Sequence, residues 1–389
     1  MRADMQYLAG NLHHRGATTE SERSAAEYIH DRLHACSPEA SIDDFYATGV
    51  GFGLFAAYYT EFAFVAVLAL WWPWVFFGYG IAVTLAYMAE LTGYDVFARF
   101  LPHYETQNVS ARFLAARPER LVVVTAHYDS PKSCPLTDRP GSRWLRPGHA
   151  VLVLCMTVVI VSCAAQGLGL CGEAAFRIDL IGRFSAVGVL LAVALALLLW
   201  EWGAEYSRGA NDNASGVAVL LALADRLRDD PPDGADVWLV TTGSQSAWFS
   251  GMRQFLTTHG LDRDSTCIIN IDSVGQGGLR YVTGEGLLHV FACDKELVAL
   301  ARKTAECHNA QPHRVTGFPT DLLLPLARGY KALGITAVAS AGTGREQSDT
   351  SDRASDIDYD TLTSAAEFTE AIVRGLAGRS TGPRKGESV

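Results

Sequence analysis

The sequence predicts an α/β protein with a mostly parallel sheet covered on both faces, interrupted by about four transmembrane helices in two hairpins. Short apolar runs typical of buried strands alternate with helical segments along much of the chain. Two long blocks carry almost no charge and are long enough to cross a bilayer. The 389 residues leave ample material for a core beside these blocks.

The composition limits the classes of partner. A net charge of −10 and a pI near 5.6 argue against nucleic acid as a partner. Only 19% of the residues are charged while 49% are hydrophobic, and the two uncharged blocks explain this imbalance. The eight cysteines show no CxxC spacing, which favours reduced thiols over a zinc finger or a disulfide framework.

The first apolar block runs from 45 to 89 and carries a single charge, Glu61. It is long enough for two crossings with a turn at Pro73. The tryptophans around that proline fit an interfacial belt. A single tilted span followed by a buried segment is the alternative.

The second apolar block has two parts, 150–172 and 184–200. We expect the polar residues between them to form a short loop, so that the two parts make a helical hairpin. That expected loop contains Glu173, Arg177, Asp179 and Arg183.

Both blocks interrupt what we expect to be one sheet, so each must cross the membrane an even number of times. We therefore expect one discontinuous α/β domain (1–44, 103–147 and 205–377), two transmembrane hairpins (45–102 and 148–204) and a disordered tail (378–389). The chain is therefore expected to be a multi-pass membrane protein in contact with lipid. Most arginines and lysines near the spans lie on the domain side, which predicts that the α/β domain is cytoplasmic.

The remaining segments supply the strands and helices of the α/β domain. Thr18 opens a capped amphipathic helix that we expect to end at His34. The other expected helices are near 214–228, 294–307 and 361–376, and the expected strands are 121–126, 236–241, 267–271 and 337–339.

Acidic and histidine side chains follow the predicted strands. His127 and Asp129 end the first strand, Asp272 ends a later one, and Asp212 lies in a tight turn before a helix. The carboxyl ends of parallel strands share one edge of a sheet, where sites in such folds collect. Imidazole and carboxylate are ligands for zinc, and a carboxylate two residues from a histidine can orient its ring.

In these motifs the chain resembles the M28 family of zinc aminopeptidases. The motifs are VVVTAHYDS (122–130), GANDNASGVAVLLALA (209–224) and INIDSVG (269–275). The resemblance implies a three-layer α/β/α sandwich with a two-zinc site. It implies that His127 and Asp272 bind one zinc, that Asp212 bridges both ions and that Asp129 orients His127.

The chain departs from the family at three positions. Where the family has its general-base glutamate and a ligand of the second zinc, this chain has Gln245 and Ser246. The family's last histidine ligand is matched by Ser348 or Gln347. The ligands of one zinc are therefore kept, while the private ligands of the other and the base are replaced.

These departures predict a membrane-anchored pseudopeptidase that binds a peptidic or amide-bearing ligand with at most one zinc ion. One alternative is an active single-zinc hydrolase whose base is another acid, and a docking scaffold for a second membrane protein is the other. Candidates for a substitute base are Glu346, Asp349, Asp352 and Asp129.

Overall fold

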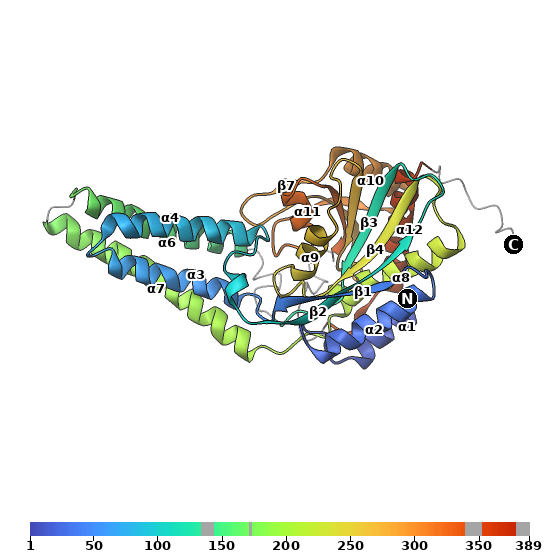
Figure 1. Ribbon diagram of the computed structural model, residues 1–389, viewed down its shortest axis with the longest axis horizontal. Coiled ribbons are helices and arrows are strands. Elements are labelled where there is room, and N and C mark those ends of the chain that lie inside the picture. The colour runs from blue at the N-terminus through green and yellow to red at the C-terminus, as the bar shows by residue number, and fades with distance from the viewer. Residues whose placement is uncertain (134–143, 171–172, 339–351, 379–389) are drawn as a thin grey trace.

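The computed structural model describes residues 1–133, 144–170, 173–338 and 352–378. A nine-stranded mixed sheet forms the centre of the α/β part, and four apolar helices extend away from it (Figure 1). The strand order is β1-β2-β4-β3-β5-β9-β6-β7, with β8 on β6. The strands are β1 Ser41–Thr48, β2 His103–Phe113, β3 Arg120–His127, β4 Ala235–Thr242, β5 Thr266–Ile271, β6 Gly278–Glu285, β7 Phe291–Ala292, β8 Gln311–Val315 and β9 Lys331–Val338.

The centre of the sheet is parallel: β4, β3, β5 and β9 pair side by side in the same direction. Their sequences are continuous apolar runs because both faces of a parallel sheet are covered. In β3, Val122 and Val124 enter one hydrophobic core while Val123 enters the other. The predicted α/β class is confirmed.

Helices on one face of the sheet enclose the first core. They are α1 Arg2–Met5, α2 Glu20–His34, α8 Ser215–Asp229, α10 Lys295–His308 and α12 Tyr359–Leu376. Short helices α9 Ser250–Thr258 and α11 Leu323–Ala327 pack on the other face, together with the base of the apolar helices. The predicted helices match α2, α8, α10 and α12 within a few residues. Thr19 caps α2, its side chain accepting from the Glu22 amide.

The four apolar helices form an antiparallel bundle whose base contacts the α/β domain (Figure 1). They are α3 Gly53–Leu68, α4 Pro73–Leu91, α6 Leu145–Gly167 and α7 Glu173–Gly203. Among the described residues, α4, α6 and α7 are long and apolar enough to cross a membrane, whereas α3 is shorter. Four crossings, the domain boundaries and the orientation stay predictions; 379–389 of the expected tail lie outside the described residues.

The prediction of a polar loop between the two parts of the second apolar block is wrong. Helix α7 already begins at Glu173, so Asp179 and Arg183 are helical. Arg183 is fully buried and donates to the Ser162 hydroxyl and the Gln166 side chain, and it lies 3.3 Å from the Asp179 carboxylate. Charged residues can continue an apolar helix here because their partners lie inside the bundle.

Candidate metal centre and pocket

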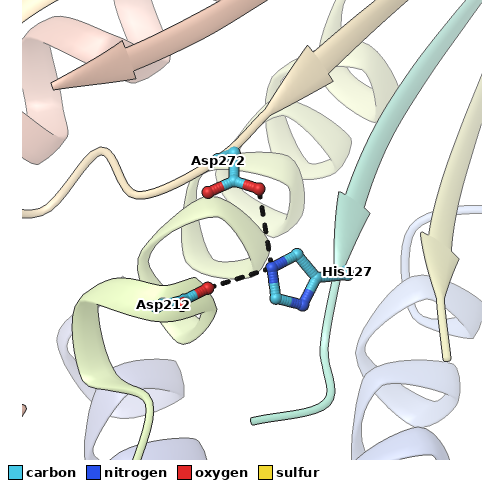
Figure 2. A group of neighbouring side chains, drawn as sticks. All are labelled: His127, Asp212 and Asp272. Carbon is cyan, nitrogen blue, oxygen red and sulfur yellow. Dashed lines mark ion pairs between the residues drawn. The ribbon is translucent and has the colours of Figure 1, made fainter. Parts of the chain in front are cut away.

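Three side chains converge at the carboxyl edge of the parallel strands (Figure 2). His127 ends β3 and Asp272 directly follows β5, and the β3–β5 register aligns these two strand ends. His127 Nε2 lies 3.1 Å from Asp212 Oδ1 and 3.6 Å from Asp272 Oδ2. In the described part of the chain, this is the one group of three side chains placed to hold a metal ion.

The turn that carries Asp212 is held from several sides. The Asp352 carboxylate accepts from the amides of Asn211 and Asp212 at 2.8–3.1 Å. The Asn213 side chain donates to the Ile271 carbonyl and accepts from the Ser273 amide, which ties the turn to the end of β5. Asp212 is thus fixed beside the strand that delivers Asp272.

Gly209 permits the tight approach of this turn. Its φ is +59°, and a Cβ atom there would lie 2.4 Å from the Asp212 carbonyl oxygen. Buried Arg15 donates to the Gly209 carbonyl and to the Tyr128 carbonyl. Arg15 therefore links the N-terminal segment to two of the three chain segments that supply the site, the end of β3 and the turn that carries Asp212.

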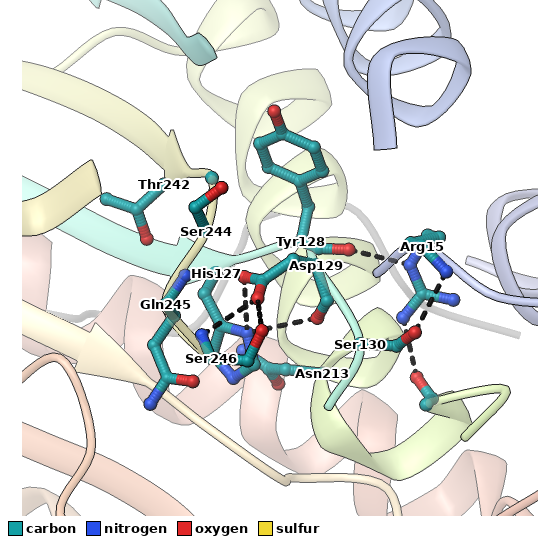
Figure 3. Close-up of polar contacts among 12 residues, drawn as sticks. Arg15, His127, Tyr128, Asp129, Ser130, Asn213, Thr242, Ser244, Gln245 and Ser246 are labelled. Atoms are coloured by element: carbon teal, nitrogen blue, oxygen red, sulfur yellow. Dashed lines mark hydrogen bonds and ion pairs between the residues drawn. The ribbon is translucent and has the colours of Figure 1, made fainter. Parts of the chain in front are cut away.

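The Asp129 carboxylate faces the other side of the imidazole ring (Figure 3). Its Oδ1 lies 3.3 Å from His127 Nδ1. It also accepts from the Gln245 amide at 2.9 Å, the Ser246 amide at 2.9 Å and the Ser246 hydroxyl at 2.7 Å. Asp129 therefore connects the ring to the loop after β4, in a position suited to the orienting role that the family resemblance implies.

The charges around the ring favour a cation at Nε2. His127 Nδ1 faces two acceptors, the carboxylate and the carbonyl oxygen of Asp129, so this nitrogen carries the hydrogen. In the neutral ring Nε2 then directs a lone pair toward Asp212 and Asp272. That arrangement is repulsive unless a proton or a metal ion lies between the three groups.

Burial and the neighbouring charges both shift the pKa values of these groups. Burial alone would lower the pKa of His127, but its contacts with Asp129, Asp212 and Asp272 outweigh burial and raise it well above its ordinary value. Burial raises the pKa of Asp212. Burial also acts to raise the pKa of Asp129, but His127 and Ser246 hold it below its ordinary value.

The donor set fits a zinc ion. Tetrahedral ligands about 2.0–2.2 Å from zinc lie about 3.3–3.6 Å from one another. The two nitrogen–oxygen separations at His127 bracket that range, at 3.1 and 3.6 Å. Three protein ligands leave a fourth position for a ligand or water.

A pocket opens beside these three residues. The space free of protein atoms there is about 870 Å³, including the part open to solvent. Asp212, Asp272, Gln245 and Ser246 contribute to its wall. The pocket therefore brings the neutral positions 245 and 246 to the candidate metal centre.

The candidates for a substitute base either accept hydrogen bonds from backbone amides or lie outside the described residues. Asp129 and Asp352 hold the backbone contacts given above. Glu346, Asp349, Gln347 and Ser348 lie outside the described residues.

Several pocket residues were not predicted as site residues. Phe52, Lys132, Trp200, Glu201 and Phe318 line the pocket. Glu201 pairs with Lys132 at 3.0 Å and accepts from the Gly53 amide at 3.2 Å. A glutamate in the last turn of a long apolar helix is the one sequence signal that could have drawn attention to this wall.

A second carboxylate, that of Glu22, contacts the loop after β4. Buried Glu22 accepts from the Ser244 amide at 2.7 Å and from the Thr106 hydroxyl at 2.9 Å. Burial raises the pKa of Glu22 to about 8. Ser244, Trp248 and Phe249 all have positive φ values, so this loop stores backbone strain beside the pocket.

Comparisons with known proteins place the chain in a structural class. Residues 194–373 match the sequence profile of peptidase family M28, a range that includes Asp212, Gln245, Ser246 and Asp272. No curated protein matches the sequence.

Solved structures share the fold at low identity. LapB from Legionella pneumophila is 9% identical with a TM-score of 0.55, covering 97% of this chain and 71% of that one. A glutaminyl cyclase from Porphyromonas gingivalis is 14% identical with a TM-score of 0.55, covering 96% of both chains. BSAP, a zinc aminopeptidase from Bacillus subtilis, is 14% identical with a TM-score of 0.54, covering 96% of this chain and 93% of that one. The chain is therefore a peptidase M28-like protein with the mixed α/β fold of zinc peptidases.

Proposed function

We propose that this chain is a membrane-anchored M28 homologue that has lost peptidase activity and whose pocket binds an amide-bearing ligand with at most one zinc ion. The observation that carries the proposal is the pairing of one three-ligand cluster with the neutral side chains of Gln245 and Ser246 in the same pocket. The cluster suits one ion, whereas positions 245 and 246 supply neither a base nor a charged ligand.

Hydrolysis of an amide needs a group that accepts a proton from water. Among the described residues, the carboxylates that line the pocket are Asp212, Asp272 and Glu201. The first two face His127, and the third is paired with Lys132. A positioned general base contributes about 10²–10⁴-fold in rate, so its replacement by glutamine removes most of the turnover.

The retained residues can still bind and orient a ligand. A zinc ion held by His127, Asp212 and Asp272 would polarise an amide carbonyl. The Gln245 side-chain amide can both donate and accept a hydrogen bond. Asp129 keeps the imidazole in one orientation and fixes the backbone of the loop that carries Gln245.

The apolar helices support membrane anchoring. They expose large hydrophobic side chains along their length, including Leu85, Leu154 and Leu195 at 58–64% exposure. Such faces are unfavourable in water and favourable in lipid. We propose four crossings, with α3 and α4 as one hairpin and α6 and α7 as the other, and with the α/β domain in the cytoplasm.

Metal analysis and a turnover assay on the full-length protein test the proposal. We expect one equivalent of zinc, lost in Asp212→Asn, and no hydrolysis of leucine amides above the metal-free control. Turnover in the ordinary range of about 1–10³ s⁻¹ that disappears in His127→Ala would overturn it. Absence of both zinc and ligand binding would favour the docking scaffold instead.

Glu201 gives one specific reason to consider the active single-zinc hydrolase. It is the remaining carboxylate in the described pocket wall, and separation from Lys132 would expose a proton acceptor. That alternative predicts measurable turnover that Glu201→Gln abolishes while the zinc content stays at one.

A further inference from the structure

The pocket is built partly by the base of the apolar helices. Phe52 immediately precedes α3, and Trp200 and Glu201 lie in the last turn of α7. Lys132 lies on the segment that leads from β3 toward α6. Three of the chain segments that join the α/β domain to the bundle therefore form one wall of the candidate site.

That wall is aromatic. The Phe52 ring lies 5.1 Å from Trp200, 5.0 Å from Phe318 and 6.1 Å from Trp248, measured between ring centroids, with edge-to-face geometry in each pair. The four rings come from the two hairpins, from the loop after β4 and from the segment before α11. A wall of this kind binds aliphatic groups through apolar contact.

The pocket also has polar groups at the candidate metal centre. Asp212 and Asp272 line it together with Gln245 and Ser246. The two carboxylates would balance the charge of a bound zinc ion, and the Gln245 side chain can donate to and accept from an amide. The described pocket wall therefore offers polar partners for an amide group and an aromatic surface for an alkyl chain.

The aromatic wall lies at the level expected for a membrane surface. Helix α4 has 19 residues, which at 1.5 Å per residue span about 28 Å, close to the thickness of a hydrocarbon core. Trp72 and Trp74 mark its far end, while exposed Trp144 and Trp202 mark the domain-side ends of α6 and α7. Tryptophan is enriched at both interfaces of a bilayer, so these residues place the interface beside the pocket.

We propose that the ligand of this pocket is an amphipathic amide, with its amide group at His127, Asp212 and Asp272 and an alkyl chain against Phe52, Trp200 and Phe318. This inference rests on the proposed function, because it assumes that the helices insert and that the centre binds an amide. The helices then have a second role beside anchoring, since their base selects ligands that partition into the membrane interface.

Binding of a homologous series tests the inference. Full-length protein, loaded with one equivalent of zinc in phosphatidylcholine nanodiscs, is titrated with leucine N-alkylamides of two, four, six and eight carbons. Dissociation constants refer to free aqueous ligand, corrected for uptake by empty discs. Burial of each methylene in an apolar site is worth about 0.8 kcal/mol, so we expect the affinity to rise about threefold to fourfold per methylene.

Two pocket variants test where the alkyl chain of the ligand binds. Phe52→Ala and Phe318→Ala are expected to flatten the dependence of the affinity on alkyl-chain length, and a retained zinc content of one equivalent shows that each variant is folded. The matched control is Phe100→Ala, which removes an equal ring that is 77% exposed outside the pocket. This control should keep the wild-type dependence.

The outcomes separate the two proposals. Ethylamide binding with no gain from longer chains overturns the amphipathic ligand and leaves the proposed function standing. An increase of affinity with alkyl-chain length that persists in both phenylalanine variants also overturns it, because the alkyl chain then binds elsewhere. Failure of the wild-type protein to bind any member of the series overturns the proposed function together with this inference.

Discussion

Replacement of Asp129 by asparagine tests how the metal centre is oriented. In either flip, the amide group of asparagine directs its NH₂ toward donors: the backbone and hydroxyl of Ser246 on one side, or the Gln245 amide and His127 Nδ1 on the other. In the first flip the Ser246 hydroxyl can turn to accept from this NH₂, so one hydrogen bond to a charged acceptor is lost, worth about 1.5–3 kcal/mol. We therefore expect the free energy of unfolding to fall by about 1.5–3 kcal/mol.

The same substitution should weaken zinc binding. Loss of a partner that orients a metal-binding histidine typically reduces the affinity about 10–100-fold. The assay is a zinc competition titration with a chromophoric chelator, accompanied by thermal unfolding of the metal-free protein. Asp294→Asn is the control, since Asp294 caps α10 with a similar contact and asparagine caps equally well. Unchanged zinc affinity in folded Asp129→Asn would refute the orienting role.

Three further variants test other parts of the structure. Gln245→Glu combined with Ser246→Glu and Ser348→His should raise the zinc content from one to two and the hydrolysis of leucine amides at least about 10²-fold; an unchanged metal content would show that the third position is misplaced. Burial raises the pKa of Glu285 from 4.5 to about 8. The folded state therefore keeps a proton that the unfolded state loses, and stability falls as the pH rises between these values. Glu285→Gln should flatten this fall, as measured by thermal midpoints at pH 5 and pH 8; equal slopes would contradict it. Arg183→Leu, which leaves buried acceptors unpaired, should lower the free energy of unfolding by about 3–5 kcal/mol, and an unchanged thermal midpoint in detergent would argue against the observed network.

The sequence predicted the centre of the sheet better than its edges. Strands β3, β4 and β5 are continuous apolar runs because both of their faces are buried. Strand β1 was missed because it is an edge strand that contains Asp43 and Asp44 and pairs antiparallel with β2. Such polar edge strands lack the apolar run that identifies a central strand.

The apolar bundle shows a different limit of prediction. The prediction of a loop around Asp179 and Arg183 was wrong because it assumed that charged residues between two apolar runs are exposed to solvent. Their partners, Ser162 and Gln166, lie on a neighbouring helix and satisfy the charges inside the bundle. Only the packing of α6 against α7 reveals that partnership.

The residues of the candidate site also differ in whether the sequence predicts them. His127 and Asp272 could be identified because they lie at the ends of parallel strands, and Asp212 because it lies in a motif at the start of a helix. Phe52 could not, because in sequence it belongs to an apolar hairpin, and the one signal at Glu201 is a charge at the end of a long apolar run. Their place in the pocket depends on how the base of the bundle packs on the domain.

The hairpin of α6 and α7 separates His127 from Asp212 in the chain. During translation the imidazole leaves the ribosome well before its carboxylate partner, and the whole hairpin must emerge and fold back before the two can meet. A soluble fragment that ends after β3 or starts after α7 carries only part of the donor set. Assembly of the centre is therefore a late event in biogenesis, and under the proposed membrane anchoring it follows insertion of this hairpin.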